Sequence, residues 1–168
     1  MPSNAMSGDI DAIVAQIARI ASAQGVTISV AESLTGGQLS AALCAAEESS
    51  GWFRGGIVAY DSEVKFTVLG VPRGPVVTAA AARSMARGAR VLLGADFSVS
   101  VTGVGGPKTS EGKPVGTVYT SVDSASMGLS SKGHCFRGEP IEVLNQTLEH
   151  ALRDLLDALR LASAAADS

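Results

Sequence analysis

The spacing of apolar residues predicts that helices and strands alternate along this chain. Over residues 8–24 apolar side chains recur every three or four positions, which predicts an amphipathic helix that ends at Gly25. Residues 26–31 instead alternate between apolar and polar, which is the pattern of a strand. Residues 37–46 return to helical spacing and are rich in alanine. The opening part of the chain therefore predicts a helix, a strand and a second helix.

The same patterns predict the elements that follow. We expect further strands over residues 57–60, 96–102, 115–122 and 131–136, and further helices over residues 62–69, 78–93 and 140–161. Asp61 and Thr78 stand where N-caps are favoured, because their side chains can accept hydrogen bonds from the first N–H groups of a helix. A turn rich in serine and glycine joins the last two strands, so we expect them to form an antiparallel hairpin.

Strands separated by helices predict an α/β fold. We expect a three-layer α/β/α domain with a mixed, mostly parallel five-stranded sheet that has one antiparallel member. The chain has 168 residues, which is enough for one buried core. We therefore predict a single domain over residues 9–162, with a disordered leader or tag remnant at residues 1–8 and a flexible tail at residues 163–168.

Polar, glycine-marked turns follow the carboxyl ends of the first three predicted strands. These turns cover residues 32–37, 60–65 and 102–107. Ligands of open α/β sheets bind beyond the carboxyl ends of the strands. We therefore expect the three turns to meet at one crevice, which is the main functional prediction that the residue pattern alone supports.

The first of these turns leads directly into a helix. Gly36 and Gly37 would let the backbone approach a ligand closely, because they carry no Cβ. The unpaired N–H groups and the dipole at the start of the helix would stabilise a phosphate or a developing oxyanion. The structural alternative is that Thr35 only caps the helix and that the two glycines only allow close packing.

Composition and charge exclude several kinds of partner. The net charge of −3 and the pI of about 5.3 argue against nucleic acid and against an anionic membrane surface. The two cysteines form no CxxC pair and no run reaches the ~20 apolar residues of a membrane span, so we expect a cytoplasmic protein. No cluster has the spacing of metal ligands, and the loop at residues 103–106 is neither a Walker A nor a dinucleotide motif. We expect no metal and no cofactor, although this loop could bind an anion.

Several side chains near the predicted crevice could carry chemistry. A hydroxyl is a weak nucleophile until a base takes its proton, and His134 and His150 are interpreted as structural or surface residues. A lysine can serve as that base if burial lowers its pKa; Tyr60 could relay the proton. The alternatives are a solvated lysine and loop serines that cap their own turns. The candidates are Ser33, Ser50, Tyr60, Lys65 and Thr102, with the carboxylate of Glu32 beside them.

Four motifs in register make the resemblance to one family specific. The chain resembles the CinA C-terminal domain family over about residues 10–160, in the motifs at 30–37, 49–60, 101–107 and 113–118. The resemblance implies a stand-alone nicotinamide mononucleotide amidase, which releases nicotinic acid mononucleotide and ammonia. It also implies a three-layer fold with a mixed five-stranded sheet, in agreement with the residue pattern.

The resemblance also implies roles for individual residues. Ser50 matches the expected nucleophile, Tyr60 and Lys65 its activating partners, and Thr102 a hydroxyl position at the site. The residues expected to hold the nucleotide are Glu32, Ser33, Thr35, Gly36, Gly37, Gly103, Gly105, Gly106 and Arg137.

The chain also departs from the family pattern. Two arginines of the family are replaced here by Pro140 and Leu144, and Arg137 is an adjacent cation that could take over their contact. The alternatives are therefore a non-catalytic nucleotide-binding or partner-binding module of the same fold, or an amidase for another small amide. Helix faces rich in alanine and leucine lead us to expect a homo-oligomer.

Overall fold

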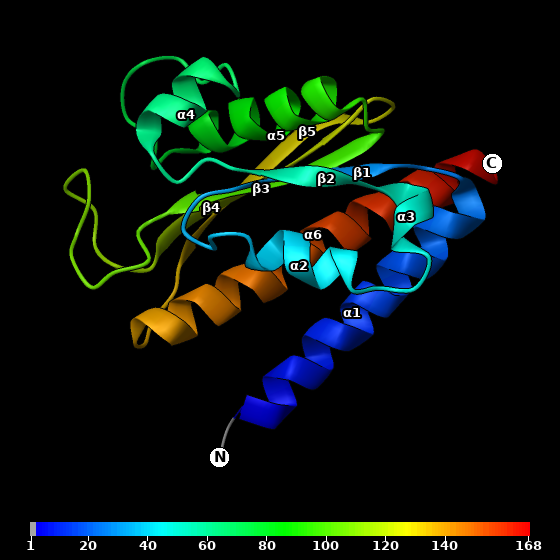
Figure 1. The fold of residues 1–168 in the computed structure, drawn as a ribbon, viewed down its shortest axis with the longest axis horizontal. Helices are drawn as coiled ribbons and strands as arrows, with labels where there is room; N and C mark the ends of the chain where they lie inside the picture. Colours follow the sequence, from blue (N-terminus) through cyan, green and yellow to red (C-terminus); the bar gives the residue numbers. More distant parts are fainter. Residues whose placement is uncertain (1–2) are drawn as a thin grey trace.

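The computed structural model describes residues 3–168, with side chains from residue 8 onward (Figure 1). The elements in chain order are α1 (Ser3–Gln24), β1 (Ile28–Glu32), α2 (Gln38–Cys44), α3 (Ser49–Trp52), β2 (Phe53–Val58), α4 (Ser62–Thr67), α5 (Ala79–Leu93), β3 (Phe97–Gly103), β4 (Thr117–Ser124), β5 (Gly128–Cys135) and α6 (Pro140–Ala166). In the part of the chain that is described, no helix is long and apolar enough to cross a bilayer.

The five strands form one mixed sheet in the order β2-β1-β3-β4-β5. β1 pairs in parallel with both β2 and β3, and β4 is antiparallel to both β3 and β5. Four strands therefore run in one direction and β4 runs against them. This arrangement confirms the predicted α/β fold class and the predicted hairpin of the last two strands.

Helices cover both faces of the sheet. α1, α2 and α6 lie on one face, and α4 and α5 lie on the other (Figure 1). Alternate side chains of β3 face opposite layers of the fold. Phe97, Val99 and Val101 join the core under α1 and α6. Ser100 faces α5 instead, where its Oγ donates to the Ala82 carbonyl at 2.6 Å. The two apolar layers are thus built from alternate residues of the same strands.

Two helix caps were predicted correctly. The Asp61 carboxylate accepts from the Glu63 N–H at 2.7 Å at the start of α4. The Thr78 hydroxyl accepts from the Ala81 N–H at 3.0 Å at the start of α5. Both are local hydrogen bonds within one turn, which is why residue type and position were sufficient to predict them.

The start of β2 and the two chain ends differ from the prediction. β2 begins at Phe53 because Gly55 and Gly56 lie inside the strand, where the pairing with β1 is irregular, and not in a turn before it. A Cβ on Gly56 would lie 2.0 Å from the Ser40 Oγ, so α2 packs directly on this part of the strand. α1 begins at Ser3 and α6 continues to Ala166, so helix replaces most of the predicted leader and tail. Residues 1 and 2 lie outside the described residues.

Candidate active site

The predicted crevice is present at the carboxyl edge of the sheet. It has a volume of about 240 Å³ and lies where the ends of β1, β2 and β3 meet the start of α6. Its lining residues are Ser33, Leu34, Tyr60, Gly103, Gly105, Gly106, Pro140 and Leu144. The convergence predicted from the three turns is therefore confirmed, and α6 adds a wall that was not predicted.

Lys65 is buried just behind this edge of the sheet. Its side chain is 2% exposed, and its Nζ donates to the Ala59 carbonyl at 2.7 Å and to the Tyr60 carbonyl at 3.2 Å. Burial lowers the pKa of Lys65, while the negative charges of Asp61 and Glu111 act in the opposite direction. The alternative of a solvated helix lysine is wrong. An ammonium has three N–H donors, and two of them are hydrogen-bonded to these carbonyls. The third position on the nitrogen remains free for proton exchange.

Ser33 is the hydroxyl that the fold brings to the same edge. It follows Glu32, whose carbonyl accepts from the Ala59 N–H at 2.8 Å, so Ser33 adjoins the strand end that Lys65 holds. Ser33 is 7% exposed and lines the crevice. Its Oγ has no hydrogen-bond partner among the described residues. A free hydroxyl and a buried lysine amine at the same strand end are the two groups that a serine–lysine pair requires.

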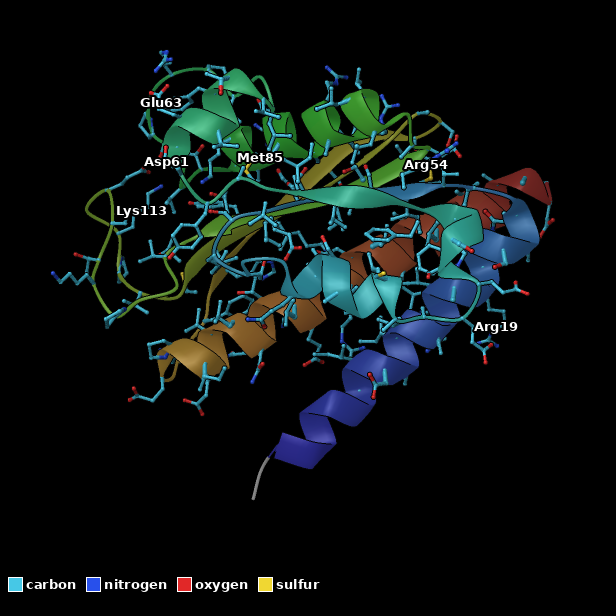
Figure 2. All side chains as sticks on the ribbon, viewed as in Figure 1. Arg19, Arg54, Asp61, Glu63, Met85 and Lys113 are labelled. Atoms are coloured by element: carbon cyan, nitrogen blue, oxygen red, sulfur yellow. The ribbon has the colours of Figure 1, made fainter. Side chains whose placement is uncertain are left out.

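Ser50 does not reach this site. It lies in α3, directly before β2, whereas Tyr60 and Lys65 follow the other end of that strand. β2 has six residues, so its ends are about 17 Å apart. Figure 2 places Arg54, at the start of β2, and Asp61, beyond its end, at opposite sides of the molecule. The predicted meeting of Ser50 with Tyr60 and Lys65 in one pocket is therefore wrong.

Glu32 is a structural anchor and does not face the crevice. Its carboxylate is fully buried and accepts hydrogen bonds from the hydroxyls and N–H groups around the start of α2. The donors are Thr35 Oγ1 (2.7 Å), Gly37 N (3.2 Å), Leu39 N (2.8 Å), Ser40 N (2.9 Å) and Ser40 Oγ (2.7 Å). The start of this helix is thus already occupied by a negative charge. The expected roles of Glu32, Thr35 and Gly37 in holding the nucleotide are corrected accordingly.

The rest of this turn holds Ser33 in place. The Gly36 N–H donates to the Ser33 carbonyl at 3.1 Å, with a φ of +56° at Gly36 that favours glycine. Gly36 itself is exposed and does not line the crevice. Thr35 does not cap α2, because Gly37 is the N-cap residue and the Thr35 hydroxyl is bound to Glu32. Ser33 is therefore the one predicted residue of this motif that lines the crevice.

The third turn contributes backbone and no side-chain hydroxyl. Thr102 is 1% exposed and donates its hydroxyl to the Val76 carbonyl at 2.8 Å, so its expected place at the reacting centre is not supported. Gly103, Gly105 and Gly106 do line the crevice, as expected. The N–H groups of Gly105 and Gly106 have no partner among the described residues. Two adjacent free N–H groups can stabilise an oxyanion.

Arg137 lies outside the crevice. It is exposed, and its carbonyl accepts from Gln146 Nε2 at 2.8 Å. The lining positions of α6 are Pro140 and Leu144, together with Leu34 from the first turn. Pro140 and Leu144 were noted in the sequence as replacements of two family arginines, and that departure was the signal that could have placed them at the site. The expected contact of Arg137 with substrate is not supported.

The two histidines pack together away from the crevice. His134 stacks on Phe136 with ring centroids 4.9 Å apart, and His150 lies 5.0 Å from His134. Burial and the neighbouring His150 lower the pKa of His134. Within residues 3–168, no group of three or more acidic, histidine or cysteine side chains is arranged to hold a metal ion.

Comparison with known proteins extends over nearly the whole chain. The family model of the CinA C-terminal domain matches residues 10–159. A CinA-like protein of Geobacter metallireducens is 40% identical over 140 residues, which is 80% of this chain and 34% of the relative. A putative competence-damage inducible protein of Desulforamulus reducens is 41% identical over 134 residues, covering 77% of this chain and 32% of the relative. The chain thus spans about a third of the length of these curated relatives.

Solved structures give the same result. A CinA superfamily protein from Klebsiella pneumoniae has a TM-score of 0.85 and 30% identity, covering 90% of this chain and 98% of that one. A competence/damage inducible protein from Agrobacterium tumefaciens has a TM-score of 0.85 and 31% identity, covering 90% and 96%. The chain therefore belongs to the CinA C-terminal domain family.

Proposed function

We propose that this protein is an amidohydrolase that cleaves a carboxamide with Ser33 as nucleophile and Lys65 as its base. Nicotinamide mononucleotide is the substrate that the family resemblance implies, and it is the first compound to assay. Two observations carry the proposal. The buried amine of Lys65 holds the Ala59 carbonyl, and the free hydroxyl of Ser33 directly follows Glu32, whose carbonyl accepts from the Ala59 N–H.

The proposed reaction begins with proton transfer. Neutral Lys65 takes the proton of the Ser33 hydroxyl, and the oxygen attacks the amide carbon. The N–H groups of Gly105 and Gly106 stabilise the negative oxygen of the tetrahedral intermediate. Lys65 then gives the proton to the leaving nitrogen, and ammonia departs. Water hydrolyses the resulting ester in the same manner, which releases the carboxylate and restores the Ser33 hydroxyl.

Tyr60 lies where it can contact the substrate. It lines the crevice, and its side chain is 74% exposed, so its ring can cover a bound aromatic amide without displacing core residues. Its carbonyl is one of the two that hold Lys65. Tyr60 thus supports the proposal through position, and its predicted role as a proton relay stays a prediction.

Ammonia release from the purified chain tests the proposal. The variants Ser33→Ala and Lys65→Met should each lose about 10³-fold or more in kcat, because each removes a reacting group. Ser50→Ala is the matched control, since it removes a hydroxyl of the same kind at the other end of β2 and should keep wild-type turnover. Full activity of Ser33→Ala, or loss of activity in Ser50→Ala, would reject Ser33 as the nucleophile.

A further inference from the structure

We infer that this crevice selects a carboxamide that carries no phosphate or other anionic group. The inference rests on the proposed function and specifies its substrate class. A bound phosphate needs cationic side chains or free N–H groups of a helix start. The free N–H groups of Gly105 and Gly106 are taken up by the oxyanion in the proposed reaction, so a phosphate would depend on other cations or helix starts near the crevice.

The lining side chains include no cation among the residues that the structure describes. Leu34, Pro140 and Leu144 form an apolar wall, and Ser33 and Tyr60 supply only hydroxyls. The Leu34 and Leu144 side chains lie against Gly105, where an added Cβ would be 3.5 Å and 3.9 Å from them. This wall is therefore suited to an uncharged or aromatic group, and a phosphate placed against it would lose water without gaining a partner.

The helix starts near the crevice are neutralised, and at the start of α4 the Asp61 carboxylate accepts from a backbone N–H of that helix. The first N–H groups of α2 point at the buried carboxylate of Glu32. α6 begins with Pro140, which has no N–H, and the Glu142 carboxylate accepts from the Glu139 N–H at 2.6 Å. Negative charge thus already stands at the positive end of each helix dipole.

The nearby cationic side chains either are hydrogen-bonded to carbonyl groups or lie outside the crevice. Lys65 holds the Ala59 and Tyr60 carbonyls and faces the carboxylates of Asp61 and Glu111. Lys113 donates to the Val77 carbonyl and lies over the Tyr119 ring. Arg137 is exposed and does not line the crevice. Lys108 is exposed and follows the Gly106 turn, so it is the cation that a phosphate could still recruit.

Among the described residues, the lining of the crevice therefore offers no cationic side chain to a phosphate. A phosphate monoester carries about −1.5 to −2 charges at neutral pH. Nicotinamide riboside carries the same carboxamide and ring as nicotinamide mononucleotide, but it is a cation without the phosphate. These two compounds therefore test the inference with one chemical difference between them.

The measurement is kcat/KM for ammonia release from each of the two compounds at low salt. We expect the wild-type chain to prefer the riboside by about tenfold, which corresponds to about 1.4 kcal/mol. Binding of both compounds to Ser33→Ala, which does not depend on turnover, should show the same preference. Ammonia from neither compound would refute the proposed function, whereas efficient turnover of the nucleotide over the riboside would overturn only the inference.

A variant that adds a cation to the crevice wall provides a second test, in which turnover of the nucleotide should increase. Leu144→Arg places a guanidinium on the crevice wall and should shift the kcat/KM ratio about tenfold toward the nucleotide. Ile141→Arg is the matched control, because it adds the same charge to the same helix at a side chain that is 59% exposed and outside the lining. An equal shift in both variants, or selective loss of nucleotide turnover in Lys108→Ala, would contradict the inference. If Leu144→Arg does not fold, the wild-type ratio decides alone.

Discussion

Replacing Lys65 with methionine should change how the stability of the protein depends on pH. The pKa of Lys65 is lowered in the folded protein by burial, whereas an unfolded lysine titrates near about 10.4. Between these two pKa values the unfolded chain binds more protons than the folded protein. The free energy of unfolding should therefore rise as pH rises through this window, because the cost of burying the charged amine disappears.

The size of the effect follows from the burial of the amine. The Lys65 side chain is 2% exposed, so water screens little of the cost. Each unit by which the pKa is lowered contributes about 1.4 kcal/mol to the difference in stability across the window. Methionine fills a similar volume and cannot titrate, although it leaves the Ala59 and Tyr60 carbonyls without their donor. That loss lowers stability at every pH and does not alter the slope.

Urea denaturation at a series of pH values from about 7 to 10 measures this slope. Wild type should gain stability over the range relative to Lys65→Met, whose curve should be flatter. Lys108→Met is the control, because it removes an exposed lysine and should keep the wild-type slope. Parallel curves for wild type and Lys65→Met would refute a buried amine with a lowered pKa, and with it the proposed base.

Three further predictions concern activity and the turns around the site. The kcat/KM for ammonia release should increase with pH as Lys65 loses its proton; a profile that falls over the same range would contradict a lysine base. Glu32→Gln should lower the free energy of unfolding in urea by about 3 kcal/mol, because an amide nitrogen would face two donors of Ser40; a loss under about 0.5 kcal/mol would show that the buried carboxylate is not an anchor. Gly88→Ala should lower it by about 2 kcal/mol or more, because the added Cβ would lie 2.2 Å from the Leu69 carbonyl oxygen, and unchanged thermal unfolding would contradict this close packing.

Local patterns carried most of the fold prediction. Apolar spacing located the strands and every helix except the four-residue α3, and a single side chain fixed the caps at Asp61 and Thr78. The start of β2 was missed because a glycine pair is typical of turns, whereas Gly56 is required here for contact with α2. That requirement comes from a neighbouring element and leaves no pattern within the strand itself.

The location of the site was predicted correctly, because it follows from the direction of the strands, whereas the roles of several residues were not. Turns at the carboxyl ends of parallel strands converge, which correctly brought Ser33, Tyr60 and the glycine loop together. Ser50 was misplaced because its motif is close to Tyr60 in sequence, although a full strand separates the two in space. Strand direction alone could have favoured Ser33, since it follows a strand and Ser50 precedes one.

The role of Glu32 depends on details that the sequence does not fix. A carboxylate before two glycines is compatible both with substrate binding and with anchoring a helix start. Only the fold of the turn decides, because it folds back and directs five donors at one buried side chain. The apolar wall from α6 was likewise missed, since it comes from the far end of the chain.

Labelling of the nucleophile tests the central claim most directly. A fluorophosphonate reacts with serines that a base activates, and peptide mass spectrometry locates the adduct. We predict that the adduct forms on Ser33 in the wild-type chain and that it is lost in Lys65→Met. An adduct on Ser50, or labelling of Ser33 that does not depend on Lys65, would contradict the pairing of these two side chains.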